Sequence, residues 1–345
     1  MNKLRFIHLI PEDRVGGVEV AAKSFPFFEN DIFKYSVKYI YDYPELRSDI
    51  FFSLFRYLKI ICLARKISKG DVNVIIVSLW RSCLCGLLIK LFNPKIKLIT
   101  FLHSCNDVHF VDYLLTRISV LFSFRIFSDS AATILQRLPW LSSTRVDIVS
   151  FVINRYSNSL SKNATPSFIF WGRLSKEKGL DIAIDFFYTI YRNYEYASFL
   201  IIGPDCGVLS SLKTQVKSLK LESSVIFSGP LSSSEIVKRA SMASFYLQAS
   251  HYEGMGMSVV EAMQLGLVPV VTPVGQIASY CKDGYNSVFL NNKNSLKDVL
   301  FAIENVDIYH ALSQNSVTTW KNHQIYSEAM IAACEKIAKL LEKTG

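Results

Sequence analysis

The chain has 345 residues, half of them hydrophobic, so it is long enough to build two domains with separate cores. No stretch reaches the roughly 18 consecutive apolar positions of a membrane-spanning helix. The apolar segment after Met1 stops at Pro11, which favours a first strand over a signal peptide. Seven cysteines, odd in number and without a Cys-x-x-Cys pair, predict buried thiols in a reducing cytosol and disfavour a metal site.

The net charge of +9 is concentrated in the first half of the chain. Residues 1–155 hold 21 Lys and Arg against 13 Asp and Glu, or +8, whereas the remaining 190 hold 17 against 16, or +1. A basic half-chain suits a nucleic acid or an anionic membrane surface. Because no zinc finger, RNA-binding signature or Arg-rich tail is present, we expect the membrane and no nucleic acid.

Taken in chain order, the first half alternates apolar strands with helices. Gly16 and Gly17 open the first helix, where free N–H groups suit phosphate or sugar oxygens, although a plain strand-to-helix turn explains the pair equally well. We expect strands at residues 4–10, 35–41, 72–79, 96–102, 125–128 and 146–152, and further helices within 47–69, 80–92 and 111–122. This alternation predicts a doubly wound α/β domain.

The segment 47–69 is basic and aromatic, with six basic residues against one acidic. Arg56, Lys59 and Lys66 fall on one helical face, as in helices that lie in a membrane interface. A core-facing helix with a solvated basic face is the alternative, and the sequence leaves both open.

The second half repeats the pattern after a polar linker at residues 154–165. Strands are expected at 168–171, 198–202, 225–228, 245–247 and 268–271, with helices at 180–191, after the capping box that begins at Ser232, and at 326–341. We therefore divide the chain into a first domain (1–155), a second domain (156–325) and a C-terminal helix (326–345).

One stretch of this half carries two carboxylates beside a glycine turn. Glu253 precedes the segment Gly254-Met255-Gly256-Met257, and Glu261 follows seven residues after Gly254 on a short helix. A carboxylate can accept hydrogen bonds from sugar hydroxyls or from the vicinal diol of a ribose, and glycines admit ligands to backbone N–H groups. Helix capping alone would also explain a Glu and glycines here.

Three motifs together resemble glycosyltransferase family 4, whose members are retaining enzymes of the GT-B fold. They are the Glu253–Glu261 pair, the loop Gly172-Arg173-Leu174-Ser175-Lys176-Glu177-Lys178-Gly179, and the segment Gly16-Gly17-Val18-Glu19. The resemblance implies two Rossmann-like domains facing each other across a cleft, with the C-terminal helix (326–345) crossing back to the first. The first domain (1–155) would face the acceptor and the membrane, and the second (156–325) would bind the nucleotide sugar.

The resemblance also assigns roles to residues. Arg173 and Lys178 would hold the donor diphosphate, and Glu261 the ribose. Glu253 and the N–H groups of Gly254, Met255, Gly256 and Met257 would hold sugar hydroxyls. Gly16, Gly17 and His103 would face the sugar.

Two segments depart from the family pattern. Residues 275–279 read Gly-Gln-Ile-Ala-Ser where the family has a Gly-Gly-x-Pro-Glu turn, and residues 150–154 lack its Asn-Gly-Val. These departures weaken inferences about the donor base and the hinge. There is no Asp-x-Asp pair, so we expect no divalent metal and no other cofactor.

The expected function is retaining, metal-independent transfer of a hexose or N-acetylhexosamine from a nucleoside-diphosphate sugar. The expected acceptor is a lipid-linked or lipopolysaccharide-type saccharide in bacterial surface polysaccharide (O-antigen) synthesis. We expect a cytoplasmic enzyme, peripheral on the inner face of the cytoplasmic membrane. The alternatives are a GT-B sugar-nucleotide epimerase or hydrolase, and a non-catalytic scaffold partner of another transferase.

Overall fold

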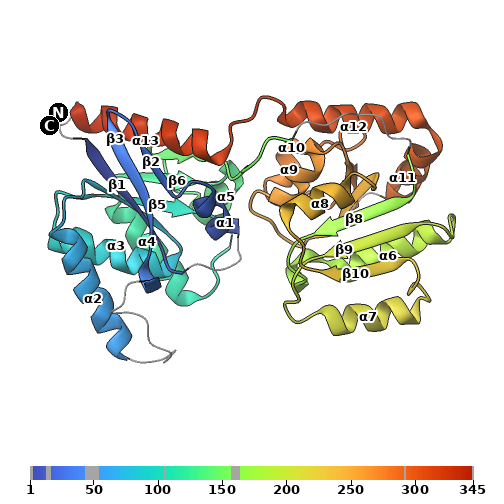
Figure 1. Ribbon diagram of the computed structural model, residues 1–345, viewed down its shortest axis with the longest axis horizontal. Coiled ribbons are helices and arrows are strands. Elements are labelled where there is room, and N and C mark those ends of the chain that lie inside the picture. The colour runs from blue at the N-terminus through green and yellow to red at the C-terminus, as the bar shows by residue number, and fades with distance from the viewer. Residues whose placement is uncertain are drawn as a thin grey trace. The chain divides into compact units, whose positions relative to one another are not determined.

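The structure is a computed structural model that describes residues 3–12, 17–42, 54–104, 106–156, 164–290 and 293–343, without the side chains of residues 54–57. The chain divides into two compact units (Figure 1). The first comprises Met1–Ile153 and Gln324–Gly345, and the second comprises Asn154–His323. The boundaries expected after residues 155 and 325 lie two positions C-terminal to the observed ones.

The first unit contains a seven-stranded sheet in the order β2-β3-β1-β4-β5-β6-β7. All neighbouring strands are parallel except β2 and β3. The strands are β1 (Leu4–Ile10), β2 (Phe27–Glu29), β3 (Phe33–Tyr39), β4 (Val74–Ser78), β5 (Lys97–Leu102), β6 (Arg125–Ser128) and β7 (Val146–Ile148). The near-continuous apolar strands β4 and β5 are buried along almost their whole length, as expected for parallel strands covered on both faces.

Helices cover both faces of this sheet. One face carries α2 (Leu54–Ser68), α3 (Trp80–Phe92) and α4 (Phe110–Phe122), which pack side by side in that order. The unit also contains α1 (Gly17–Ser24), the 3₁₀ turn η1 (Ile40–Asp42), α5 (Ala131–Arg137) and the 3₁₀ turn η3 (Ser143–Arg145). Ile60, Leu63, Ala64 and Ile67 of α2 are buried in a core cluster with β4 and α3. Thus one side of α2 faces the core, while Arg65 and Lys66 are exposed.

The other face of the sheet is covered by α13 (Tyr326–Glu342), which returns from the second unit (Figure 1). The Tyr326 N–H donates to the carbonyl of Val152 at 2.6 Å, and Lys336 forms an ion pair with Asp147 of β7. The core on this face is largely aromatic and includes Phe6, Phe33, Tyr35, Phe101, Phe151 and Tyr326. Buried aromatic contact therefore holds the last helix against the first unit.

The second unit contains a six-stranded parallel sheet in the order β10-β9-β8-β11-β12-β13. Its strands are β8 (Ser167–Trp171), β9 (Ser198–Ile202), β10 (Val225–Gly229), β11 (Phe245–Gln248), β12 (Val268–Val271) and β13 (Val288–Phe289). Its helices are the 3₁₀ turn η4 (Lys176–Lys178), α6 (Leu180–Tyr191), α7 (Leu209–Ser218), α8 (Ser233–Ala240), α9 (Met257–Gln264), α10 (Ile277–Tyr280), α11 (Ser295–Glu304) and α12 (Val306–Trp320). This strand order is one of the two common doubly wound arrangements.

The structure contains several short or polar elements that the sequence did not predict. They are β2, α5, α7, α10, α11, α12 and β13. The expected strand at 35–41 is β3, which begins at Phe33 and gives way to η1 at Ile40. Two cysteines, Cys62 and Cys206, are exposed, which corrects the expectation of buried thiols at those positions.

Candidate functional site

The site of the second unit lies where the strand order of its sheet reverses. From β8 the chain proceeds outward to β9 and β10, and it then returns to β11 on the other side of β8. The loops that follow β8 and β11 therefore leave the same sheet edge in opposite directions. Ligands of doubly wound sheets bind at such a switch point, outside the carboxyl ends of the strands.

The two loops at this point are in direct contact. The N–H of His251 donates to the carbonyl of Glu177 at 2.9 Å. Gly179 has a φ of +57°, and a Cβ there would lie 2.0 Å from the carbonyl oxygen of Ala249. Only glycine tolerates both the left-handed backbone and this approach. The close contact brings the Arg173–Lys178 motif to the Glu253 motif.

Lys178 and Glu253 form an ion pair across these loops. The Nζ of Lys178 lies 2.6 Å from Oε1 of Glu253, and the two side chains are only 16% and 10% exposed. The same oxygen accepts hydrogen bonds from Nε2 of Gln248 and Oγ of Ser250, both at 2.8 Å. Three donors therefore fix one carboxylate oxygen at the carboxyl end of β11.

Arg173 has a different environment from Lys178. Its side chain is 56% exposed and its Nη2 lies 3.5 Å from Oε1 of Glu177, four residues away. A pair this exposed contributes little to stability. The guanidinium therefore remains accessible to an incoming anion beside the buried ammonium of Lys178.

Glu261 lies on α9, close to the end of β8. Its Oε2 accepts a hydrogen bond from the indole N–H of Trp171 at 2.8 Å. Burial raises the pKa of this carboxyl, and the bond from Trp171 partly opposes that rise. The negative charge of Glu261 also contributes, after burial, to the raised pKa of Tyr156.

The buried Tyr246 contacts polar groups near the ends of both β8 and β11. The hydroxyl of Tyr246 lies 2.6 Å from Oε1 of Gln248, 2.8 Å from Oγ of Ser258 and 3.3 Å from the carbonyl oxygen of Trp171. Because Gln248 in turn donates to Glu253, the strand residues orient the carboxylate. The sequence motifs did not single out Gln248, Ser250 or Tyr246; their only signal is that polar side chains follow one another at the end of an apolar strand.

The turn of Gly254 to Met257 is held in place by the segment after β12. The hydroxyl of Tyr280 donates to the carbonyl of Met255 at 2.7 Å, and the N–H of Gln276 donates to the carbonyl of Gly254 at 3.0 Å. Gly256 caps α9 with a φ of +70°, and a Cβ there would lie 2.8 Å from Ile277 and from the Tyr280 hydroxyl. Residues 275–280, which depart from the family pattern, therefore buttress the turn.

His103 lies in the first unit, just after β5. Its Nε2 is 2.6 Å from the hydroxyl of Ser78, and its ring stacks on that of Phe151 with centroids 4.8 Å apart. Its Nδ1 is buried and has no hydrogen-bond partner in the described part of the chain. Burial, followed by the proximity of His8 and of Arg137, lowers the pKa of His103 well below its ordinary value. The imidazole is therefore neutral near pH 7.

A second buried histidine shares the same hydroxyl. Nε2 of His8 is 2.6 Å from Oγ of Ser78, and its Nδ1 is 2.8 Å from the hydroxyl of Tyr35. Burial lowers the pKa of His8 to about 3. Leu79, which follows Ser78, has a φ of +68°, an uncommon backbone conformation for a residue with a side chain.

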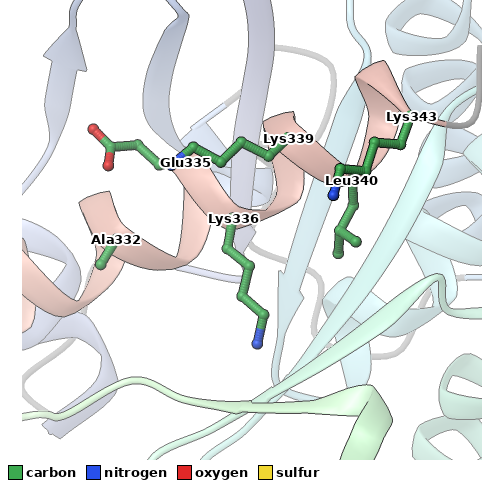
Figure 2. A pocket seen from close by; sticks show the side chains of 6 residues that line it. All are labelled: Ala332, Glu335, Lys336, Lys339, Leu340 and Lys343. Carbon is green, nitrogen blue, oxygen red and sulfur yellow. The ribbon is translucent and has the colours of Figure 1, made fainter.

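The remaining expected site residues contribute less to this description. Gly17 is exposed at the start of α1, and Gly16 lies outside the described residues. The residues that the structure describes contain no group of three or more His, Cys, Asp or Glu arranged to hold a metal ion. A surface depression of about 280 Å³ lies on α13 and is lined by Ala332, Glu335, Lys336, Lys339, Leu340 and Lys343 (Figure 2). None of the expected site residues lines it.

The comparison with protein families agrees with this geometry. Residues 153–317, nearly the whole second unit, match the family described as glycosyl transferases group 1. The second unit is thus similar to this family along nearly its whole length. Its two motif loops thus lie in the part of the chain that matches the family.

Curated relatives are similar over part of their length. The alpha-monoglucosyldiacylglycerol synthase of Acholeplasma laidlawii is 28% identical over 168 residues, which is 48% of this chain and 41% of that protein. The GDP-mannose:cellobiosyl-diphosphopolyprenol alpha-mannosyltransferase of Komagataeibacter xylinus is 26% identical over 184 residues, 50% of this chain and 46% of that protein. The match thus spans less than half the length of these relatives.

Solved structures extend the likeness to both units. The Anabaena protein HepE in complex with UDP-glucose superposes with a TM-score of 0.72, over 99% of this chain and 100% of that one, at 16% identity. An identity this low shows the fold alone. The fold is GT-B, built from two parallel-sheet α/β units as the sequence predicted.

Proposed function

We propose that this protein is a retaining glycosyltransferase. It moves a hexose or N-acetylhexosamine from a nucleoside-diphosphate sugar to a lipid-linked or lipopolysaccharide-type saccharide. The observation that carries the proposal is the pairing of Lys178 with Glu253 at 2.6 Å, beside Glu261, at the switch point of the second sheet. That pairing joins two motifs of opposite charge at the edge where such sheets bind nucleotides.

The charges suit a donor with an anionic and a polyhydroxylated end. Arg173 and Lys178, two of the three basic residues in the loop that follows β8, are assigned to the diphosphate. Glu253 accepts hydroxyls of the sugar, and Glu261 accepts the vicinal hydroxyls of the ribose. Without donor, Glu253 neutralises Lys178; a bound diphosphate would share that ammonium.

The chemical step breaks the bond between the anomeric carbon and the phosphate oxygen and forms a bond from the same carbon to the acceptor oxygen. Retention requires both on one face of the sugar. The acceptor hydroxyl gives its proton to the leaving phosphate oxygen, so no carboxylate acts as a nucleophile. Arg173 and Lys178 stabilise the charge on the leaving group, the kind of contribution that usually dominates at such sites. His103, neutral and hydrogen-bonded to Ser78, is assigned to the sugar.

We assign no divalent metal to this reaction, because the two basic residues supply the positive charge that a metal would bring. A chelator should leave turnover unchanged. Full loss with EDTA, reversed by Mn²⁺, would contradict this part of the proposal.

The acceptor assignment draws on two observations. The names of the two relatives described above contain a diacylglycerol and a diphosphopolyprenol, both lipids. The first half of this chain carries the excess positive charge, +8 of +9. No helix in the described part of the chain is long and apolar enough to cross a membrane. We therefore propose a peripheral enzyme on the inner face of the cytoplasmic membrane, serving surface polysaccharide (O-antigen) synthesis.

The first test is thermal-shift binding of UDP, GDP and dTDP and their sugars, followed by mass spectrometry of products on lipid-linked acceptors. The proposal expects stabilisation by one nucleotide family and an acceptor heavier by one sugar. Rapid turnover of donor without acceptor would instead favour a GT-B epimerase or hydrolase. Nucleotide-sugar binding without product over a broad acceptor panel would favour a non-catalytic scaffold.

A further inference from the structure

Helix α4 presents its polar side to the core and its apolar side to solvent. The residues that it buries are Asp112, Thr116, Ser119 and Val120, three of them polar. The large hydrophobic residues that it exposes, with Val108 just before it, are Val108, Phe110, Val111, Tyr113, Leu114, Leu121 and Phe122. This is the reverse of the ordinary arrangement of a surface helix.

Buried hydrogen bonds hold α4 in this orientation. Ser119 lies 2.6 Å from the hydroxyl of Thr100 on β5. Asp112 accepts from Nη2 of Arg137 and from the hydroxyl of Thr116, both at 2.9 Å. Rotating the helix to bury its apolar side would leave these polar groups without partners, at a cost of about 1–3 kcal/mol for each neutral group and more for a charged one. The inverted orientation is therefore specified by the fold.

The exposed apolar stripe runs the length of the helix. Phe110 at its start is 74% exposed, and Leu121 and Phe122 at its end are 64% and 61% exposed. Thirteen helical residues extend about 20 Å. Contiguous apolar surface of this kind on a soluble protein usually marks a site of contact.

The neighbouring helices continue this surface. Helix α3 packs against α4, and α2 against α3, and both carry large exposed apolar residues: Leu58 and Ile61 on α2, and Leu91 and Phe92 on α3. The helices α2, α3 and α4 contain four, two and one basic residues, seven in all, against none, none and one acidic residue. That one acid is the buried Asp112.

The acidic groups near the ends of these helices are already paired. Asp71, just after α2, contacts Nε of Arg5 at 3.1 Å. Asp107, before α4, forms ion pairs with Arg117 and Arg137 at 2.9 and 2.6 Å. On α3, Arg81 forms an ion pair with Glu12 at 3.2 Å. The layer of α2, α3 and α4 thus offers apolar side chains and positive charge that comes mainly from α2, with its only acid buried.

We propose that the outer side of this three-helix layer, centred on the apolar stripe of α4, inserts into the interface of an anionic bilayer. Aromatic and aliphatic side chains flanked by Lys and Arg are what such an interface binds. A bilayer satisfies both features at once, since its acyl region accepts the apolar stripe and its anionic headgroups the basic residues. The inference rests on the proposed function for its biological setting, because it deepens the assignment of a membrane partner.

It also changes which residues carry the contact. The sequence pointed to the basic, aromatic segment of α2 with Arg56, Lys59 and Lys66, whose electrostatic attraction salt would screen. Insertion of α4 adds a hydrophobic contribution to membrane binding that salt does not remove. Binding should therefore fall with salt but persist in part at high salt.

The experiment compares two triple variants of the full chain. One replaces Phe110→Ser, Leu121→Ser and Phe122→Ser on α4. The matched control replaces exposed hydrophobic residues of the second unit, Tyr196→Ser, Ile226→Ser and Met242→Ser, which are 73%, 55% and 70% exposed. Flotation with phosphatidylcholine vesicles, with and without phosphatidylglycerol, is measured at low and high salt.

The parent and the control should bind the anionic vesicles equally, with part of the binding remaining at high salt. The α4 variant should partition roughly tenfold or more weakly and lose the salt-resistant part, because three large apolar side chains no longer enter the bilayer. Reversing Lys59→Glu and Lys66→Glu should remove only the salt-sensitive part.

Three results overturn the inference. The first is vesicle binding by the α4 variant equal to that of the parent, and the second is no binding by the parent at low salt. The third is a dimer of the parent, seen by sedimentation, that dissociates in the α4 variant, which would assign the stripe to a second copy of the chain. Circular dichroism and nucleotide binding confirm that each variant is folded. Vesicle binding without any nucleotide binding would contradict the proposed function and leave this inference standing.

Discussion

His8 and His103 hydrogen-bond to the same hydroxyl, that of Ser78, and each Nε2 lies 2.6 Å from it. A hydroxyl has one proton, so it can donate to only one of two neutral histidines. The other must donate its own Nε2–H to the oxygen. The two histidines, 95 positions apart in the chain, therefore cannot both accept from Ser78. We expect opposite tautomers, because only then does one histidine use the Ser78 proton while the other donates to the oxygen.

The first prediction follows from this shared proton. Nitrogen NMR of the imidazoles should show one histidine protonated at Nε2 and the other at Nδ1. In Ser78→Ala this opposition should disappear and turnover should fall, while Ser78→Thr, which keeps a hydroxyl, should restore both. Ser82→Ala is the control, because the Ser82 hydroxyl is buried without a hydrogen-bond partner among the described residues. The same tautomer at both histidines of the parent would refute the prediction.

The second prediction concerns stability against pH. The pKa of His8 is about 3 in the folded protein, whereas an unfolded histidine has a pKa of about 6.5. The unfolded chain therefore binds more protons below pH 6.5. The contribution of His8 is complete above that pH and is lost as the pH falls, by about 2 kcal/mol at pH 5. The lowered pKa of His103 acts in the same direction.

Urea unfolding at several pH values measures this effect. Burial raises the pKa of Asp129 to about 6, which gives a contribution of opposite sign, so variants must be compared rather than a single curve read. His8→Gln should have a shallower loss of stability between pH 7 and pH 5 than the parent. A parallel profile for His8→Gln would show that His8 does not titrate as described.

The third prediction tests the ion pair of Lys178 and Glu253. Lys178→Met should destabilise the protein by roughly 3 kcal/mol, because it leaves a largely buried carboxylate with neutral donors only. The double variant Lys178→Met, Glu253→Gln should recover most of that stability but none of the turnover. Chemical unfolding of the parent, Lys178→Met, Glu253→Gln and the double variant gives the coupling energy. Strictly additive losses would mean that the two side chains do not interact.

The fourth prediction separates catalysis from stability at Arg173. Because its side chain is 56% exposed, Arg173→Ala should change the free energy of unfolding by no more than about 0.5 kcal/mol. Turnover should nevertheless fall about 10²–10³-fold, the usual effect of removing one group that stabilises developing charge. Arg192→Ala, an exposed arginine at the end of α6, is the control. Unchanged kinetics in Arg173→Ala would refute its assignment to the diphosphate.

Local pattern was enough to predict many elements and both charged motifs. The bounds of α3 (Trp80–Phe92), β6 (Arg125–Ser128) and β9 (Ser198–Ile202) coincide with the expectation, because each is an apolar run between clear turn signals. Helix α7 was missed, since its Ser, Lys and Thr residues carry too weak a periodic signal, and its place depends on packing against α6. The alternation of strands and helices predicted the doubly wound units, and the resemblance of the three motifs to glycosyltransferase family 4 implied the GT-B fold.

The tertiary structure determines which partners the residues of these motifs and helices contact. Lys178 and Glu253 are 75 positions apart, and nothing in either motif states that one ammonium and one carboxylate oxygen become partners. The sequence likewise identifies α4 as an apolar helix but not which side of it faces the core. That choice depends on Thr100 and Arg137 from other elements, whose hydrogen bonds make burial of the polar side favourable and leave the phenylalanines in solvent. Hydrophobicity is a property of each residue, whereas the direction in which a helix faces is set by partners distant in the chain.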